Sequence, residues 1–255
     1  MSGRLQDKVC VITGAGGGMG AEAARVFTDE GARVVVADVD GDAAAKVAGE
    51  VGGLAVQVGV SDDASVQAMY RAAASEYGGI DVLYNNAGIS PADDDSILDT
   101  SLEAWERVQA VNTRGVFLCC KYGIPHLLER GGGSVINVAS FVALVGAATS
   151  QISYTASKGA VLSMSKELGV QFARQGVRVN ALCPGPVETP LLLRIWSETP
   201  GAAERRLVHV PMGRFAEATE IAAAVAFLAS DDASFITAST FLVDGGISGA
   251  YVTPL

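Results

Sequence analysis

Short apolar runs alternate with segments of helical periodicity along almost the whole chain, and this alternation restricts the possible folds more than any other feature. Short apolar runs bounded by turn residues are typical of buried strands, whereas apolar residues three and four positions apart indicate helices. Strands that alternate with helices form a parallel sheet with right-handed crossovers on both of its faces. We therefore predict an α/β fold, a doubly wound sheet of seven parallel strands. The expected strands are 9–13, 33–37, 54–58, 80–84, 135–139, 177–182 and 240–243, and the expected helices are 19–30, 42–51, 62–77, 101–130, 159–172 and 218–228.

Local signals refine this outline. Ser61 and Ser101 precede two of the helices as expected caps, because serine oxygens accept bonds from the first helical N–H groups. Pro125 lies inside the helix expected over 101–130 and predicts a kink there. The chain contains no linker, low-complexity tract or short-period repeat, so we predict one domain over residues 1–255. The proline-rich stretch 184–212 is irregular and is the expected mobile substrate loop.

Composition and charge narrow the class of protein. The formal net charge of −10 argues against nucleic acid and anionic membrane surfaces as partners. No apolar run approaches the length of a membrane span, and the short polar N-terminus argues against a signal peptide. The four cysteines, found at 10, 119, 120 and 183, form no Cys-x-x-Cys pair and are interpreted as reduced thiols, which predicts a cytoplasmic protein. The two histidines, His126 and His209, stand far apart, and we expect no metal site.

A glycine-rich turn follows the first expected strand and opens the first helix. Glycines in this position let a pyrophosphate approach the backbone and the helix N-terminus. We therefore assign Gly14, Gly17, Gly18 and Met19 to a dinucleotide site, although glycines also serve ordinary turns. Met19 stands where the last glycine of a Gly-x-Gly-x-x-Gly pattern would be, so the spacing that fits is Gly-x-x-x-Gly-x-Gly.

Asp38 ends the second expected strand and decides which dinucleotide is predicted. A carboxylate there accepts hydrogen bonds from the adenosine ribose hydroxyls and repels a 2′-phosphate. Gly17 and the neighbouring Val39 offer no cation to hold such a phosphate. The predicted cofactor is therefore NAD, with a turn-capping aspartate as the alternative interpretation.

Tyr154 and Lys158 stand four residues apart at the start of a helical segment. Positions i and i+4 share a helix face, so the phenol and the ammonium can point into one site. A nearby cation favours phenolate and would lower the pKa of the tyrosine, which makes it usable as an acid or base. Such a pair also occurs on ordinary solvated faces.

The order of these motifs resembles the short-chain dehydrogenase/reductase family along nearly the whole chain. The shared marks are Thr-Gly-x-x-x-Gly-x-Gly at 13–20, Asn-Asn-Ala-Gly at 85–88, Asn112, Ser140, Tyr-x-x-x-Lys at 154–158 and Pro-Gly-Pro-Val-Glu-Thr at 184–189. The resemblance implies a single Rossmann-type domain, frequently assembled as a homotetramer. It also implies hydride transfer between a nicotinamide cofactor and an alcohol or carbonyl.

The resemblance also implies the roles of individual residues. Tyr154 would exchange a proton with the substrate oxygen, Lys158 would hold the nicotinamide ribose, Ser140 would bind the substrate oxygen, and Asn112 would position a water molecule. The remaining contacts to the cofactor would come from Val60, Asn86, Ala87, Gly88, Pro184, Gly185, Val187 and Thr189. The residues expected to line the substrate site are Phe141, Val142, Leu144, Gln151 and Pro186.

The chain departs from the family pattern at two places. Gly59 stands where the family commonly has an aspartate that contacts adenine, and Asp62 is a possible substitute. The loop between Ser140 and Tyr154 is one residue longer than usual, near 147–151. The second departure concerns the shape of the substrate site more than catalysis.

We predict an NAD-dependent oxidoreductase that acts on a secondary alcohol or ketone, such as a small cyclic or aliphatic alcohol, a steroid-like ring or a dihydrodiol. One alternative is a 3-oxoacyl thioester (acyl-carrier-protein) reductase, although most such enzymes use NADPH. An alternative of another class is a non-catalytic NAD-binding protein. Activity on alcohols separates enzyme from binder, and reduction of an acetoacetyl thioester separates the two enzymes.

Overall fold

The computed structural model of the chain describes residues 3–147, 149–189, 192 and 201–250. Its centre is a sheet of seven parallel strands in the order β3-β2-β1-β4-β5-β6-β7. The strands are β1 (Val9–Thr13), β2 (Arg33–Asp38), β3 (Leu54–Gln57), β4 (Val82–Asn85), β5 (Gly133–Val138), β6 (Val177–Pro184) and β7 (Thr240–Val243). The predicted doubly wound, Rossmann-type sheet is confirmed. The strand order reverses between β1 and β4, and ligands of such sheets bind outside the carboxyl ends of the strands at this point.

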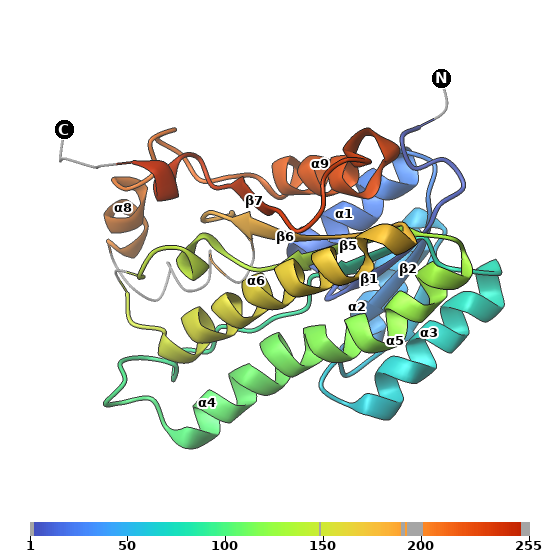
Figure 1. The fold of residues 1–255 in the computed structure, drawn as a ribbon. Helices are drawn as coiled ribbons and strands as arrows, with labels where there is room; N and C mark the ends of the chain where they lie inside the picture. Colours follow the sequence, from blue (N-terminus) through green and yellow to red (C-terminus); the bar gives the residue numbers. More distant parts are fainter. Residues whose placement is uncertain (1–2, 148, 190–191, 193–200, 251–255) are drawn as a thin grey trace.

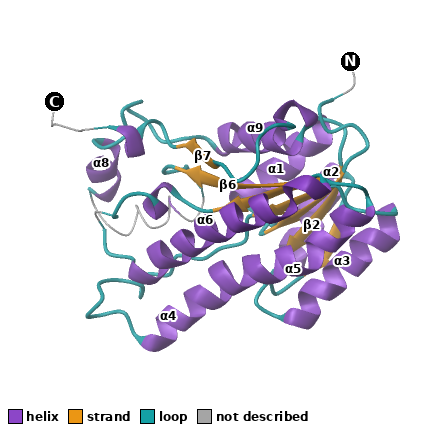
Figure 2. Cartoon of the chain, viewed as in Figure 1, coloured by secondary structure: helices purple, strands orange, loops and turns teal. Residues whose placement is uncertain are grey.

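Helices cover both faces of the sheet (Figure 1). On one face lie α1 (Gly18–Asp29), α2 (Gly41–Val51) and α9 (Ala218–Ala229), and on the other lie α3 (Asp63–Tyr77), α5 (Gly115–Glu129) and α6 (Ile152–Phe172). Two separate apolar clusters fill the spaces between the helices and the sheet. Figure 2 shows the resulting order of layers, with the strands between two sets of helices. Both faces of the central strands are therefore apolar, which explains their almost unbroken hydrophobic sequences.

The helix predicted over 101–130 is divided into three parts. It consists of α4 (Leu102–Gln109), a π-helical segment (Ala110–Arg114) and α5. Ser101 caps it as expected, because its hydroxyl accepts from the N–H of Ala104 at 3.1 Å. Pro125 lies inside α5, which continues to Glu129. A π segment contains one extra residue per turn, and such segments are frequent at functional sites.

One other helix start differs from prediction. Asp62 and not Ser61 caps α3, because its carboxylate accepts from the N–H of Ser65 at 2.7 Å. The helix with Tyr154 begins at Ile152 and so contains both Tyr154 and Lys158, as their shared helix face requires. The stretch 184–212 also contains a short helix, α8 (Ala202–Leu207), while 190–191 and 193–200 lie outside the described residues. Its predicted mobility therefore stays a prediction.

All four cysteines are free and buried, as expected for core thiols. Over the described ranges, no helix has both the length and the apolar character that a membrane crossing requires.

Candidate active site

The glycine-rich turn and the Asn-Asn-Ala-Gly segment meet where β1 and β4 end. The side-chain amide of Asn86 donates to the carbonyl oxygens of Thr13 and Gly14, both at 3.0 Å. The N–H of Ala87 donates to the hydroxyl of Thr13 at 3.2 Å. Gly14 has a φ of +64°, and a Cβ atom there would lie 2.8 Å from the Cα of Ala87. Only glycine fits this crossing, so the turn is held against β4 by its own backbone.

The outer side of the turn is open. Gly17 is the N-cap residue of α1 and caps the helix with no side chain, and a Cβ atom on it would have nothing within 4 Å. A helix N-terminus of this kind presents backbone N–H groups and a positive dipole end to an anion. The methyl group of Thr189 lies 3.7 Å from where a Cβ of Gly18 would be. The glycine-rich turn and Thr189 of the 184–189 segment therefore lie close together.

Asp38 lies beside this turn, as predicted. Its carboxylate accepts from the N–H groups of Gly16 at 2.8 Å and Asp40 at 3.0 Å. The neighbouring Val39 is 71% exposed and brings no charge. Asp62, the possible adenine contact, uses a carboxylate oxygen to cap α3. Of two further predicted cofactor residues, Val60 is buried, whereas Met19 is partly exposed and packs against the core.

Lys158 is buried between the sheet and the tyrosine. Only 3% of it is exposed, its Nζ donates to the carbonyl oxygen of Val138 at 2.7 Å, and it lies 5.5 Å from the ring centroid of Tyr154. Burial lowers the pKa of Lys158 to about 8. A Cβ atom on Gly88 would lie 3.4 Å from the same Nζ. The predicted cofactor and catalytic residues therefore meet here.

The expected effect of Lys158 on the tyrosine is not found. Burial raises the pKa of Tyr154, and hydrogen bonding with Ser140 lowers it in part. The reason is geometric: the ammonium lies over the ring and bonds Val138, whereas Ser140 is next to the phenol. The prediction that Lys158 keeps the pKa of the tyrosine low is therefore wrong for this structure. Ser140 and Tyr154 are brought together as predicted.

Asn112 lies in the π segment, and its side chain is fully engaged. Its oxygen accepts from the N–H of Ile89 at 2.8 Å, and its amide donates to the Ile89 carbonyl at 2.9 Å and to the Ser157 hydroxyl at 3.1 Å. The side chain therefore fixes the 86–98 loop to α6. The water-positioning role of Asn112 stays a prediction.

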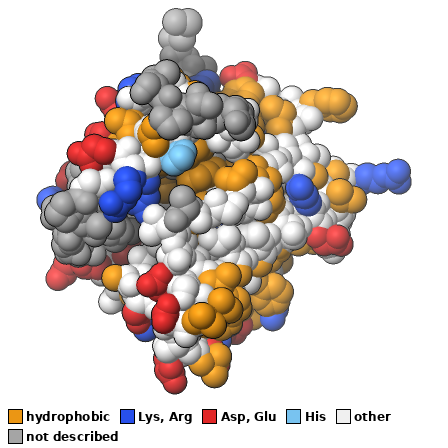
Figure 3. Space-filling view, turned by 90° about the vertical axis from the view of Figure 1, so that its left-hand side faces the viewer, with side chains coloured by type: hydrophobic (Ala, Val, Ile, Leu, Met, Phe, Trp, Pro, Cys, Tyr) orange, Lys and Arg blue, Asp and Glu red, His pale blue; other side chains and the backbone are white. Residues whose placement is uncertain are grey.

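The predicted substrate-lining residues differ in their exposure. Phe141, Gln151 and Pro186 are partly exposed, Leu144 is 43% exposed, and Val142 is buried. The β6 and β7 arrows of Figure 1 point to this end of the molecule, and Figure 3 looks onto it. Hydrophobic side chains gather at the middle of that face. Residue 148, within the longer loop, lies outside the described residues.

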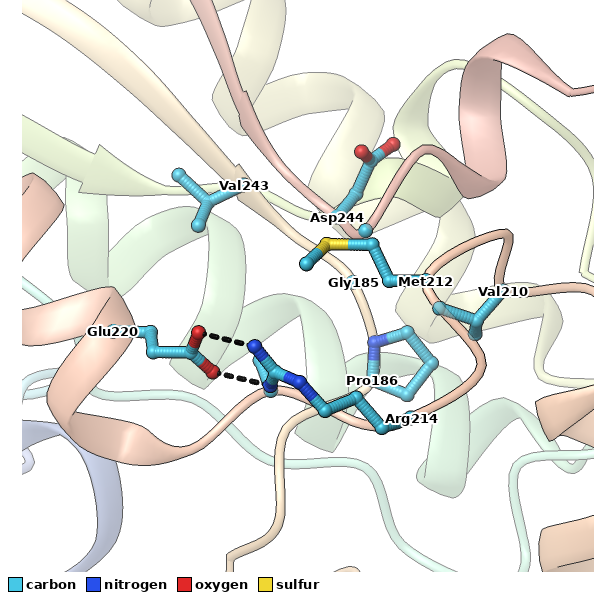
Figure 4. A pocket seen from close by; sticks show the side chains of 10 residues that line it. Gly185, Pro186, Val210, Met212, Arg214, Glu220, Val243 and Asp244 are labelled. Atoms are coloured by element: carbon cyan, nitrogen blue, oxygen red, sulfur yellow. Dashed lines mark hydrogen bonds and ion pairs between the residues drawn. The ribbon is translucent and has the colours of Figure 1, made fainter.

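A cavity of about 60 Å³ lies beyond the ends of β6 and β7 (Figure 4). Gly185 and Pro186 line it, and the ion pair of Arg214 and Glu220 closes one wall. Gly185 has no room for a side chain, because a Cβ atom would lie 2.8 Å from the backbone of Asp244. The backbone around Gly185 is thereby fixed next to the expected nicotinamide position. The part of the chain that the structure describes contains no cluster of three or more acidic, histidine or cysteine ligands for a metal.

Sequence reasoning missed Asp94. It lies in the 86–98 loop between two other aspartates, yet it is 4% exposed and its carboxylate bonds the backbone of Ser153 and Tyr154. The run of three aspartates was visible, but nothing local distinguishes the buried one from its exposed neighbours.

Comparisons with known proteins place this geometry in a family. Residues 14–248 match the Enoyl-(Acyl carrier protein) reductase family. The meso-2,3-butanediol dehydrogenase of Serratia marcescens is 42% identical over 97% of both chains. The D-threitol dehydrogenase of Mycolicibacterium smegmatis is 39% identical over 95% of this chain and 94% of that protein. The crystal structure of a 3-ketoacyl-(acyl-carrier-protein) reductase from Brucella melitensis complexed with NADH superimposes with a TM-score of 0.89 at 39% identity, covering 96% of this chain and 99% of that one.

Proposed function

The chain belongs to the short-chain dehydrogenase/reductase family and is an oxidoreductase of CH–OH groups, and we propose that it transfers hydride between NAD(H) and a small secondary alcohol or the corresponding ketone. The observation that supports this most is the meeting of Ser140, Tyr154 and Lys158 with the open glycine-rich turn at the strand ends. The nicotinamide supplies or accepts the hydride when it is bound.

The side chains around Tyr154 would handle the proton and the substrate oxygen. Tyr154 would donate its phenolic proton to the carbonyl oxygen in reduction, or take the proton of the alcohol in oxidation. Ser140 would hydrogen-bond the same oxygen and so fix its direction. Lys158 would hold the nicotinamide ribose hydroxyls. Thr189 and the backbone of Gly185 and Val187 would hold the nicotinamide carboxamide.

The preference for NAD over NADP is part of the proposal. The Asp38 carboxylate is held at the edge of the turn by two backbone N–H groups, and it would accept from the adenosine ribose hydroxyls there. A 2′-phosphate there would meet this carboxylate, and the exposed Val39 adjoining it cannot neutralise the phosphate.

The substrate class follows from the relatives and the lining. The two relatives are dehydrogenases of a diol and of a tetritol, both secondary alcohols with a neighbouring hydroxyl. The expected lining here is largely apolar, with Gln151 as its polar member. We therefore place small vicinal diols first, and the 3-oxoacyl thioester reductase and the non-catalytic binder become outcomes of the test.

Assembly and location are further parts of the proposal. Large apolar side chains remain exposed on three helices, with Leu102 at 66%, Phe117 at 50% and Val170 at 73%. Closed symmetric assembly would cover such faces, so we propose a homotetramer, with a mass four times the 26.1 kDa of the chain. Four buried free thiols support a reducing compartment and hence a cytoplasmic location.

A substrate screen tests the function. The purified protein is mixed with NAD or NADP and a panel of simple secondary alcohols, vicinal diols and polyols, and NADH or NADPH absorbance is followed at neutral and alkaline pH. Acetoacetyl thioester with NADH is the contrasting substrate. Turnover of a diol with NAD supports the proposal, turnover of the thioester alone would favour the reductase, and NADH binding without any turnover would favour the binder.

A further inference from the structure

The loop between β4 and α4 holds the N-terminus of the helix that contains Tyr154. One carboxylate oxygen of Asp94 accepts from the N–H of Ser153 at 2.8 Å, and the other accepts from the N–H of Tyr154 at 2.7 Å. The N–H of Ile152 donates to the carbonyl oxygen of Asp95 at 3.1 Å. Three successive N–H groups at the start of α6 are thus satisfied by two residues of this loop.

This cap differs from an ordinary helix cap in its origin. The first N–H groups of a helix are usually bonded by the side chain of the residue just before it. Here Gln151, the residue in that place, makes no side-chain cap bond, and the acceptor lies 60 residues from Tyr154 in sequence. The cap therefore determines where α6 begins relative to the loop that also contains Gly88 and Ile89.

The chemistry of Asp94 suits a rigid clamp. Its carboxylate is 4% exposed and lies at the positive end of the helix dipole. Its carboxylate accepts from two backbone N–H groups, and charge-assisted bonds of this kind are shorter and stronger than neutral ones. Arg107 forms its ion pair with Asp93 instead, at 2.6 Å and 2.7 Å. Within the described part of the chain, the buried carboxylate is thus bonded by the start of α6 and by no side chain that could swing away.

Residues of α4 also hold the start of α6. The hydroxyl of Ser153 donates to the carbonyl oxygen of Trp105 at 3.0 Å, and the amide of Gln109 donates to the Ser153 carbonyl oxygen at 3.0 Å. The other end of the loop is fixed where Ile89 bonds Asn112. The backbone of Tyr154 is therefore held between the loop and α4.

We propose that Asp94 is a positioning residue for Tyr154: its carboxylate fixes the tyrosine backbone so that the phenol stays beside Ser140. This inference rests on the proposed catalytic role of Tyr154. Small displacements of a reacting group can cost about 10²-fold in rate. Loss of the clamp should consequently reduce turnover while the glycine-rich turn still binds the cofactor.

The test compares Asp94→Ala with Asp93→Ala in the full-length protein. Asp93 is the matched control, because it lies in the same loop and has the same charge but bonds Arg107 and not α6. We expect Asp94→Ala to lower kcat by roughly 10- to 100-fold, with NADH binding at full stoichiometry and its Kd within about threefold of wild type. Asp93→Ala should retain wild-type kcat. Asp94→Asn keeps the shape of the side chain and one acceptor oxygen, so its kcat should lie between those of Asp94→Ala and wild type. It replaces the alanine variant in the test if Asp94→Ala does not fold.

Two results would overturn the inference. One is a kcat of Asp94→Ala, or of Asp94→Asn if alanine is unfolded, equal to that of wild type. The other is a loss of kcat in strict proportion to a loss of NADH binding sites, because that indicates fewer folded molecules and not a displaced phenol. Tyr154→Phe is measured in parallel: wild-type turnover in that variant would refute the proposed function itself, whereas an inactive Tyr154→Phe beside a normal Asp94→Ala would refute only the role of Asp94.

Discussion

Replacing Lys158 with methionine should change how the stability of the protein depends on pH. Burial lowers the pKa of this lysine from 10.5 to about 8. In the unfolded chain the ammonium is solvated, so the unfolded state binds more protons between these two values. The free energy of unfolding must therefore rise with pH in this window. Below about pH 8 both states are charged and the full cost of burying the ammonium is present, whereas above 10.5 both are neutral and the cost vanishes.

The size of the effect follows from the same two pKa values. One unit corresponds to about 1.4 kcal/mol, so a shift from 10.5 to about 8 gives a total near 3 kcal/mol. Between about pH 7 and about pH 9.5, the wild type should gain about 2 kcal/mol relative to Lys158→Met. Taking the difference between the two proteins cancels the other titrating groups, which are common to both. Urea unfolding of each protein without cofactor, at a series of pH values, measures this difference.

A matched control makes the result specific. Lys166 lies on the same helix with an exposed side chain, and Lys166→Met should give a difference that does not vary with pH. If the difference between wild type and Lys158→Met is equally flat, the ammonium is not desolvated and our account of the buried lysine fails. Lys158→Met should also be almost inactive, because the ribose contact and the charge are both lost.

Three further predictions concern catalysis, cofactor choice and packing. Tyr154→Phe should lower turnover by about 10²–10⁴-fold in steady-state assays while NADH fluorescence titration shows unchanged binding. Wild type should favour NAD over NADP by at least about 10²-fold in kcat/KM, and Asp38→Ala with Val39→Arg should shift this preference towards NADP; a wild-type preference for NADP would show that Asp38 does not face the ribose. Gly123→Ala should destabilise the protein by about 1–3 kcal/mol in thermal or urea unfolding, because the new Cβ would lie 2.5 Å from a methyl group of Leu83.

Much of the fold could be predicted because its signals are local. Buried parallel strands appear in the sequence as continuous apolar runs. The turn after the first of these runs appears as a glycine at residue 14, where the structure has a φ of +64°. The meeting of Ser140, Tyr154 and Lys158 was also predictable, since motif order fixes which strand end each residue follows. The family resemblance supplied that order.

The features that were missed depend on contacts between distant parts of the chain. Asp94 bonds a backbone about 60 residues away, so no window around it reveals which aspartate is buried. The pKa of Tyr154 depends on whether the ammonium faces the phenol or the ring, which spacing alone does not determine. Ser61 and Asp62 are adjacent and both residue types cap helices, so the sequence alone does not show which of them caps α3. A π segment leaves no clear periodic signal, because five residues are too few to define a period.

The π segment has a consequence for insertions and deletions in this region. A π turn holds about one residue more than an α turn, so the five residues Ala110–Arg114 complete roughly the rotation that four residues make in an α-helix. Removing one residue there would let the segment become regular helix and leave α4 in nearly the same rotational register relative to α5. Removing one residue from the regular helix α5 would instead rotate α4 by about 100° about its axis, and carry Gln109 away from Ser153 and Arg107 away from Asp93. The π segment is therefore the place where this long helix can lose one residue and still keep its contacts to the start of α6.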